Sequence, residues 1–416
     1  MISAPKTIYN CHMIFRNIPL AAVVFLAGAV ITPAQVLFRY NHSAGDKWHL
    51  NVTVDEEVFI DGVSSSRSEI LNKIAVEILE GGGNSGTIWN HYDIAEKDID
   101  SGVYKWSGEY EVSYDRNVDG LLSGIPDSSP VPAVRNVPMF PSEALFPGDR
   151  WSGEGREVFN LGPTFGIPET LLIDFPVDYQ YRGTEVLDGS SFEVLEVVYG
   201  YRWTPDPLDP VHLRIMSFDW FPIEVEGVFE QVLWWDAGKG RNYAVDGSFT
   251  YTYTMSDGSS YTFRGTSAGH AVYADPMDKD ALVREIEELD RPDLRAEATD
   301  EGVMVSLDDI NFFPDQAVML PGQKDKLEHI AEILSRYPDR DILIIGHTAM
   351  VNPRNDGQLL SEQRAETVAR YFIESGVRPD TQVMTRGMGH TQPIGDNSTE
   401  EGRRRNRRVE ITILEN

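Results

Sequence analysis

The chain has almost no cysteine. Its 416 residues include a single one, Cys11, which lies before the first apolar run. One thiol cannot build a disulfide framework or a cysteine-based metal site. His, Asp and Glu show no metal-ligand spacing either, so the sequence predicts no metal and no other cofactor.

Basic residues are also scarce. The chain has 36 Lys and Arg residues against 66 Asp and Glu, which gives a formal net charge of −30. Such a surface repels phosphate backbones. Nucleic acid is therefore excluded as a non-specific partner.

Long hydrophobic runs are missing except near the N-terminus. The basic residues Lys6 and Arg16 precede the apolar run 18–31, and small residues follow up to Ala34. This order is typical of an export signal, so we expect a signal peptide at residues 1–34. Two questions stay open: Met13 is an alternative start, and an uncleaved anchor is an alternative to cleavage, although the run is short for a membrane span.

Period-two alternation marks residues 35–275 as a β-rich domain. Between Tyr104 and Tyr114, aromatic or apolar residues alternate with polar ones, and Asp257-Gly258 is a hairpin signal between two Thr- and Tyr-rich runs. About ten such runs, one of them at 212–218, have short connections. They predict an antiparallel meander, either a soluble half-barrel or a sandwich.

A proline-rich passage near 125–150 interrupts these strands. Proline cannot donate a ladder hydrogen bond, so the passage is either a long loop or a sub-boundary between two β halves. Residues 276–300 are expected to form an acidic linker helix, from Asp278 to Leu289.

From about residue 301 to 416 the pattern changes to alternating strands and helices. Leu327, Ile330 and Leu334 share one helical face, Ser361 is a candidate helix cap, and Gly376 is a candidate helix end. We expect a small α/β sandwich.

Spaced motifs in this last segment carry a family resemblance. The motifs are Phe312-Phe313, Gly346-His347-Thr348, Leu360-Ser361-x-x-Arg364-Ala365, Gly387-x-Gly389-x-x-x-Pro393, Asn397, and Gly402-Arg403-x-x-Asn406-Arg407-Arg408-Val409-Glu410. Together they resemble the OmpA-like C-terminal domain over residues 303–416. The resemblance does not reach the β-rich part.

The resemblance implies non-covalent binding of peptidoglycan through the diamino acid of its stem peptide. By position, Arg364 corresponds to the arginine that binds the ligand carboxylate, as suits a planar guanidinium. Arg407, first of the paired arginines, would line the same pocket, and Thr348 would add backbone and hydroxyl contacts. Strand alternation makes only one of Arg407 and Arg408 point inward.

Three positions depart from the family pattern. The aspartate that takes the ligand ammonium is replaced by Ala349, a glycine by Asn352, and an asparagine by Gly357. Losing one partner of a desolvated charge pair costs roughly 2–5 kcal/mol. We therefore expect a partly degenerate peptidoglycan site.

Two enzyme-like strings lack their structural context. Gly265-x-Ser267-x-Gly269 has the spacing of a nucleophile elbow, but no helix is expected after it. Gly81-x-Gly83-x-x-Gly86 precedes a strand, which a dinucleotide-binding glycine motif does not. No enzyme is predicted.

The leading hypothesis is a non-enzymatic envelope protein, in the periplasm or outer membrane, whose OmpA-like domain associates with peptidoglycan. One alternative keeps that domain as a scaffold or protein-interaction module for other envelope proteins, without peptidoglycan binding. A further alternative makes the N-terminal part a transmembrane β-barrel anchored to the wall, which period-two strands would also fit.

Overall fold

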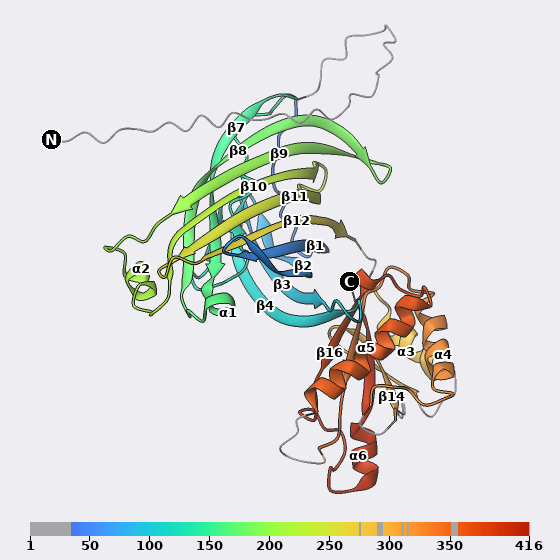
Figure 1. The fold of residues 1–416 in the computed structure, drawn as a ribbon. Coiled ribbons are helices and arrows are strands. Elements are labelled where there is room, and N and C mark those ends of the chain that lie inside the picture. The colour runs from blue at the N-terminus through green and yellow to red at the C-terminus, as the bar shows by residue number, and fades with distance from the viewer. Residues whose placement is uncertain are drawn as a thin grey trace, which may run out of the picture. The chain divides into compact units, whose positions relative to one another are not determined.

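Ten long antiparallel strands build the N-terminal part of the described chain (Figure 1). The computed structural model describes residues 35–273, 276–288, 294–308, 312–313, 316–350 and 357–415, so the predicted signal peptide lies outside them. The elements of this part are β1 (Lys47–Ile60), β2 (Val63–Gly82), β3 (Ser85–Lys97), β4 (Tyr104–Asn117), β5 (Leu122–Ser123), β6 (Val134–Arg135), β7 (Arg150–Asn160), α1 (Leu161–Phe165), β8 (Thr170–Leu187), β9 (Ser190–Trp203), α2 (Pro210–Ile215), β10 (Pro222–Asp236), β11 (Arg241–Met255) and β12 (Ser260–Val272).

These strands form one curved antiparallel sheet. The long strands follow the order β4-β3-β2-β1-β12-β11-β10-β9-β8-β7, so the chain's first strand pairs with its last one in this part. All other neighbours are consecutive in sequence, and the predicted antiparallel meander is confirmed.

One expected strand is a helix instead. Residues 212–218 contribute to α2, because Pro210 occupies its first turn and the Asp209 carboxylate accepts the Val211 and His212 N–H groups. The missing long strand is β7, which the sequence pattern did not reveal. At its inward position 155 this strand has a glycine and not an apolar side chain. A Cβ there would stand 2.5 Å from the Phe175 ring, so a larger residue does not fit.

The proline-rich passage is a packed loop between the edge strands β4 and β7. It buries Val131, Phe140 and Leu145, and Arg135 donates to the carbonyls of Pro126 and Ser129. Residues 35–416 form a single compact unit. Within the passage, β5 pairs with β4 and β6 pairs with β7, so it connects the two edges of the sheet.

The sheet buries a core rich in aromatic side chains, many in contact as stacked or edge-on pairs. Inward residues alternate along β8 and β9, as a half-buried pleated strand requires. The core includes Phe38, Tyr40, Phe140, Phe159, Phe175, Tyr179, Tyr199, Tyr201, Phe229, Trp235, Tyr253 and Phe263.

Glu157 in β7 is a buried acid within this aromatic core. It is 7% exposed, and burial raises its pKa to about 8. Among the described residues, its Oε2 and the hydroxyls of Tyr199 and Tyr201 have no hydrogen-bond partner. The folded state therefore favours the neutral, protonated acid at Glu157.

The C-terminal part is the predicted α/β sandwich. Its sheet has the order β13-β14-β17-β15-β16, with one parallel pair, β15–β16. No helix among the described residues is long and apolar enough to cross a bilayer. The elements are α3 (Lys279–Glu287), β13 (Leu294–Ala298), β14 (Gly302–Asp308), α4 (Lys324–Leu334), β15 (Ile342–Gly346), α5 (Gln358–Glu374), η1 (Asp380–Gln382), β16 (Val383–Gly387), α6 (Glu400–Asn406) and β17 (Arg408–Leu414).

Local details of this part differ from the expectations. The acidic helix α3 is present and capped by Asp278, but Leu282 and Ile286 pack into the C-terminal core, and the strand β13 follows it. Ser361 does not cap α5. It lies one turn inside the helix, which begins after Gly357, whereas Gly376 does follow the helix end in a left-handed conformation.

A short parallel pairing joins the two parts. Met384 and Thr385 of β16 pair with Tyr104 and Lys105 of β4, and the Thr385 hydroxyl donates to the Tyr104 carbonyl at 3.1 Å. Beside this pairing, Lys73 of β2 forms an ion pair with Asp341, with both side chains 6% exposed.

Replacing Lys73 by Ala should destabilise the protein strongly. Removing one member of a buried ion pair leaves the other charge desolvated and unpaired, which costs about 3–5 kcal/mol. Urea unfolding of residues 35–416 measures this. Lys47→Ala, which breaks an exposed pair with Glu77, is the matched control and should cost about 0–1 kcal/mol. Equal losses in both variants would contradict the buried pairing.

Replacing Glu157 by Gln should remove a pH dependence of stability. From pH 4.5 to about 8 the folded state holds a proton that the unfolded state releases. Stability of the parent therefore falls as pH rises through this window, by about 1.4 kcal/mol per pH unit at most.

We expect Glu157→Gln to match the parent near pH 4.5 and to exceed its free energy of unfolding by about 3–5 kcal/mol at pH 8. Urea titrations at a series of pH values measure the difference. Glu154→Gln, at an exposed position of the same strand, should follow the parent curve. Parallel curves for Glu157→Gln and the parent would disprove the neutral buried acid.

Candidate functional site

The loop that follows β15 is held in place by buried polar contacts. His347 is 1% exposed, and its Nε2 lies 3.1 Å from Glu410 Oε2. Glu410 Oε1 accepts from Arg408 Nε at 2.6 Å. Burial opposes ionisation of Glu410, but the hydrogen bond from His347 and the charge of Arg408 outweigh it and lower the pKa. His347 therefore has a structural role at the end of β15.

Thr348, a predicted site residue, contacts the start of α5. Its N–H donates to the Gly389 carbonyl at 2.7 Å. A Cβ on Gly357 would stand 2.2 Å from Thr348 Oγ1, and Gly357 has φ +66°. The glycine at this departure from the family pattern therefore allows the close approach of the Thr348 loop to the helix.

Arg364 is buried on α5 and not on an open surface. It is 7% exposed, its Nε donates to the Gln316 carbonyl at 3.2 Å, and its guanidinium lies 4.9 Å from the centre of the Phe312 ring. One helical turn earlier, the Oγ of Ser361 accepts the Gly389 N–H at 2.9 Å. Residues three apart share a helix side, so Arg364 lies one turn from Ser361, whose partner Gly389 also accepts the Thr348 N–H.

Ala349 occupies a defined, half-buried place between two fixed residues. On one side Thr348 is held as described, and on the other the Met350 N–H donates to Asn397 Oδ1 at 3.1 Å. Asn352, the remaining predicted site residue of this loop, lies outside the described residues. The backbone at position 349 is therefore fixed by the hydrogen bonds of its two neighbours.

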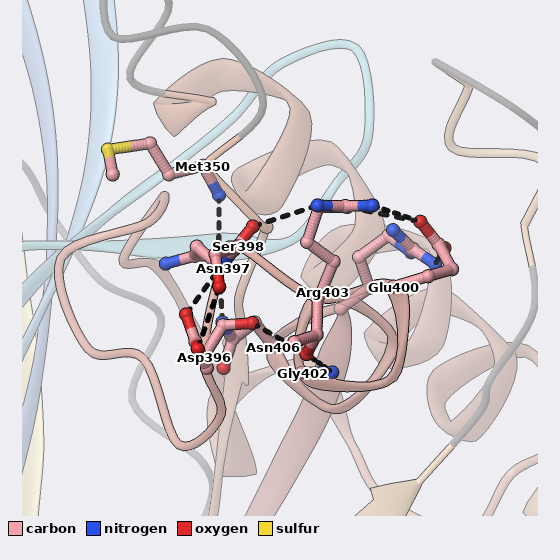
Figure 2. A network of polar contacts seen from close by, with 10 residues as sticks. Met350, Asp396, Asn397, Ser398, Glu400, Gly402, Arg403 and Asn406 are labelled. Carbon is pink, nitrogen blue, oxygen red and sulfur yellow. Dashed lines mark hydrogen bonds and ion pairs between the residues drawn. The ribbon is translucent and has the colours of Figure 1, made fainter.

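Asn406 holds the loop between β16 and α6 in place (Figure 2). It is 1% exposed, its Oδ1 accepts the N–H groups of Ile394 and Gly395, and its Nδ2 donates to the Gly395 carbonyl and to Asn397 Oδ1 at 2.8 Å. Asn397 in turn binds Met350. One buried amide thus connects α6 to the loop that carries Ala349.

The paired arginines have different surroundings. Arg407 is partly exposed and binds Glu400 through a 2.8 Å contact. Arg408 is the inward member, with its side chain 3% exposed and bound to Glu410. The structure therefore brings Thr348 and Gly357 together, buries Arg364 beside Gln316 and Phe312, and pairs Arg407 with Glu400 of α6.

The arrangement offers a buried cation beside a fixed loop, a combination suited to a carboxylate ligand. Sequence reasoning did not identify the groups that orient Arg364. Phe312 appeared in the motifs without this role, and the Gln316 carbonyl is a backbone acceptor, which leaves no signal in a side-chain pattern. No group of three or more His, Cys, Asp or Glu residues among the described ones could hold a metal. Ser267 lies within β12, so its elbow-like string has no strand-to-helix turn.

Comparison with known proteins identifies this part of the chain. Residues 311–407 match the OmpA family, and no family model matches the N-terminal part. The C-terminal part is thus an OmpA-type domain, as its motifs predicted.

Curated relatives match over the same part only. The probable lipoprotein YiaD of Escherichia coli is 36% identical over 104 residues, which are 25% of this chain and 47% of that protein. The peptidoglycan-binding protein ArfA of Mycobacterium bovis is 38% identical over 104 residues, 25% of this chain and 32% of that protein. The chain therefore spans about a third to a half of the length of these relatives.

A solved outer membrane protein from Borrelia burgdorferi is similar as well. It is 32% identical, with 29% of this chain and 96% of that chain covered and a TM-score of 0.24.

Replacing Asn406 by Asp should loosen the loop that carries Ala349. The aspartate keeps the acceptor but loses both donors and sets a carboxylate oxygen against Gly395 O and Asn397 Oδ1. Losing two buried hydrogen bonds should lower the free energy of local opening of this loop by about 1–3 kcal/mol. Amide exchange in the loop should therefore be roughly 10- to 100-fold faster. Hydrogen exchange at the Met350 and Ile394 N–H groups measures this. Ser398→Ala, which removes only an exposed bond to Asp396, is the control. Unchanged protection in Asn406→Asp would contradict the network.

Proposed function

We propose that this chain is a non-enzymatic protein of the bacterial cell envelope, in the periplasm or outer membrane, whose OmpA-type domain associates with peptidoglycan. The family match at residues 311–407 and the peptidoglycan-binding relative support the class of ligand. The expected signal peptide is consistent with export. The N-terminal sheet is then a second envelope module attached to the wall-binding one.

The observation that carries the proposal is the buried guanidinium of Arg364. This cation is 7% exposed, is oriented by the Gln316 carbonyl and the Phe312 ring, and lies one helical turn from Ser361. A guanidinium in that setting can donate two parallel hydrogen bonds to a carboxylate of low mobility. The stem-peptide diamino acid presents such a carboxylate next to an ammonium group.

The ammonium side of this proposed site is incomplete. Ala349 supplies a methyl group where a carboxylate would accept the ammonium. The expected cost of roughly 2–5 kcal/mol corresponds to about 30-fold to several-thousand-fold weaker binding than in a complete site. The proposed association is therefore weak for a single domain.

A second candidate function is a scaffold or protein-interaction module without peptidoglycan binding. Two observations favour it: the methyl group of Ala349, and the 2.8 Å contact that engages Arg407 with Glu400. In this case the buried Arg364 is a structural residue that fastens the 316–317 loop to α5. The two candidates differ in whether Arg364 changes wall binding.

Replacing Arg364 by Ala should abolish retention on purified peptidoglycan. The change removes the charge-assisted bonds to the ligand carboxylate, which is expected to weaken binding about 30-fold or more. Co-sedimentation of residues 35–416 with purified sacculi measures this. Arg370→Ala, at an exposed position on the same helix, is the matched control and should bind like the parent. If the parent and Arg364→Ala sediment equally with sacculi, only the scaffold function is left.

Replacing Ala349 by Asp should strengthen the same binding. The new carboxylate starts from a backbone fixed at Thr348 and Met350 and restores the partner of the ammonium, so we expect about a tenfold or greater gain. Titration with a soluble stem peptide containing the diamino acid measures the gain. Ala349→Asn, which has the same shape but no charge, separates charge from size. An equal effect of Asn and Asp would argue against an ammonium at this position.

A further inference from the structure

A groove lies where the outer face of the N-terminal sheet meets the C-terminal part. It encloses about 620 Å³, a size within the usual range of roughly 300–1,000 Å³ for ligand sites. Its floor comes from β1, β2, β10, β11 and β12, and its wall from Asp339, Asp341, Pro379, Thr381 and Gln382. The buried Lys73–Asp341 pair lies at the junction of floor and wall.

Strand register explains why the floor is hollow. In one row across the sheet, Asn51 pairs with His270, His270 with Ala244, and Ala244 with Trp234. In the next groove-lining row, Ala268 stands between the strands that carry Thr53 and Asp246. The small side chain of Ala268 lines the groove among larger polar ones, and Ala244 is buried beside it, so the floor is depressed here.

Three residues that line the groove carry buried polar atoms without a hydrogen-bond partner among the described residues. They are the Oδ1 of Asn51, the Nε1 of Trp234 and the Oδ1 of Asp341. Buried donors and acceptors are nearly always paired in folded proteins, because leaving one unpaired costs free energy. One donor and two acceptors around one hollow are therefore complementary to a ligand that both accepts and donates hydrogen bonds.

The charge of the groove selects the class of ligand. Asp246, Asp339 and Asp341 line it, and Lys73 is already paired with Asp341, so the groove disfavours anions. The indole of Trp234 adds an apolar ring beside these polar groups, as in sites for ligands that have both an apolar face and hydroxyl groups. Uncharged pyranose rings have this combination.

We propose that the groove is a binding site for an uncharged glycan, with Trp234 and Asn51 as its main contacts. The site stands on the groove alone, but it deepens the proposed function, since the glycan strand belongs to the same polymer as the stem peptide. It is separate from the Arg364 pocket, which lies on α5.

A tetramer of β-1,4-linked N-acetylglucosamine, which carries no stem peptide and no charge, is the probe. Isothermal titration of residues 35–416 should give saturable binding at one site. Trp234→Phe keeps an aromatic ring but removes the indole N–H, and Asn51→Ala removes the acceptor; each should weaken binding by about tenfold or more. Trp89→Phe, at a half-buried position of β3 outside the groove, is the matched control and should bind like the parent.

Two further measurements keep the test independent of folding and of the stem-peptide site. Ala268→Trp fills the floor from an exposed position that the fold tolerates, and it should abolish tetramer binding while leaving the thermal transition unchanged. Arg364→Ala should leave tetramer binding unchanged even where it reduces binding to sacculi.

The proposal is overturned if the parent shows no saturable binding, or if Trp234→Phe and Ala268→Trp bind like the parent. It is also overturned if Arg364→Ala weakens tetramer binding as much as Trp234→Phe, or if a sulphated tetramer binds more tightly than the neutral one. Loss of sacculus binding with intact tetramer binding would overturn the stem-peptide site only.

Discussion

The short parallel pairing between β4 and β16 is the contact on which the arrangement of this protein depends. Two residue pairs of backbone, Met384 with Tyr104 and Thr385 with Lys105, connect a ten-stranded curved sheet to a five-stranded α/β sandwich. Two residue pairs are too few to hold the two parts together, so side-chain contacts reinforce the pairing. Leu71, Ala95, Tyr104 and Met384 form a buried apolar cluster at the same place.

Charged side chains give this contact its specificity. Three lysines of the N-terminal sheet reach acids of the C-terminal part: Lys73 with Asp341, Lys97 with Asp380 at 2.8 Å, and Lys105 with Glu366 at 2.8 Å. In a chain with a net charge of −30, each lysine placed at this seam offsets repulsion between two acidic surfaces. Glu366 belongs to α5, the helix that also carries Arg364, so the seam holds the helix from one side while the proposed ligand pocket occupies another.

Sequence patterns predicted the parts of this fold that depend on local periodicity. Alternation along β4 and the Asp257-Gly258 hairpin were sufficient for the meander, and the spaced motifs were sufficient for the OmpA-type domain. The pattern was wrong at residues 212–218, where a helix cap and a proline override an apolar run. The sequence pattern also missed β7. Glycines stand at inward positions of this strand because rings from β8 occupy the space, and a short stretch of sequence does not contain that neighbouring strand.

The site was predictable to a similar extent. Motif spacing predicted Arg364 and Thr348 as site residues, and this stays a prediction; the fold buries both side chains. The partners of these residues were not predictable, because Gln316 contributes a backbone carbonyl, and Asn406 acts through contacts to three other residues. The groove at the seam could not be predicted at all, since it exists only where two parts distant in sequence meet.

The proposed stem-peptide site and the proposed glycan groove belong to one compact unit, so both can act on one polymer. When two modest sites engage one polymer, the second contact forms at a high effective concentration, and the combined affinity can exceed either one by about 10²- to 10⁴-fold. This gain requires a fixed spacing between the sites, which the β4–β16 pairing and the lysine–acid contacts supply. Under that constraint the loss of an aspartate at position 349 becomes tolerable, because no single site has to hold the wall alone.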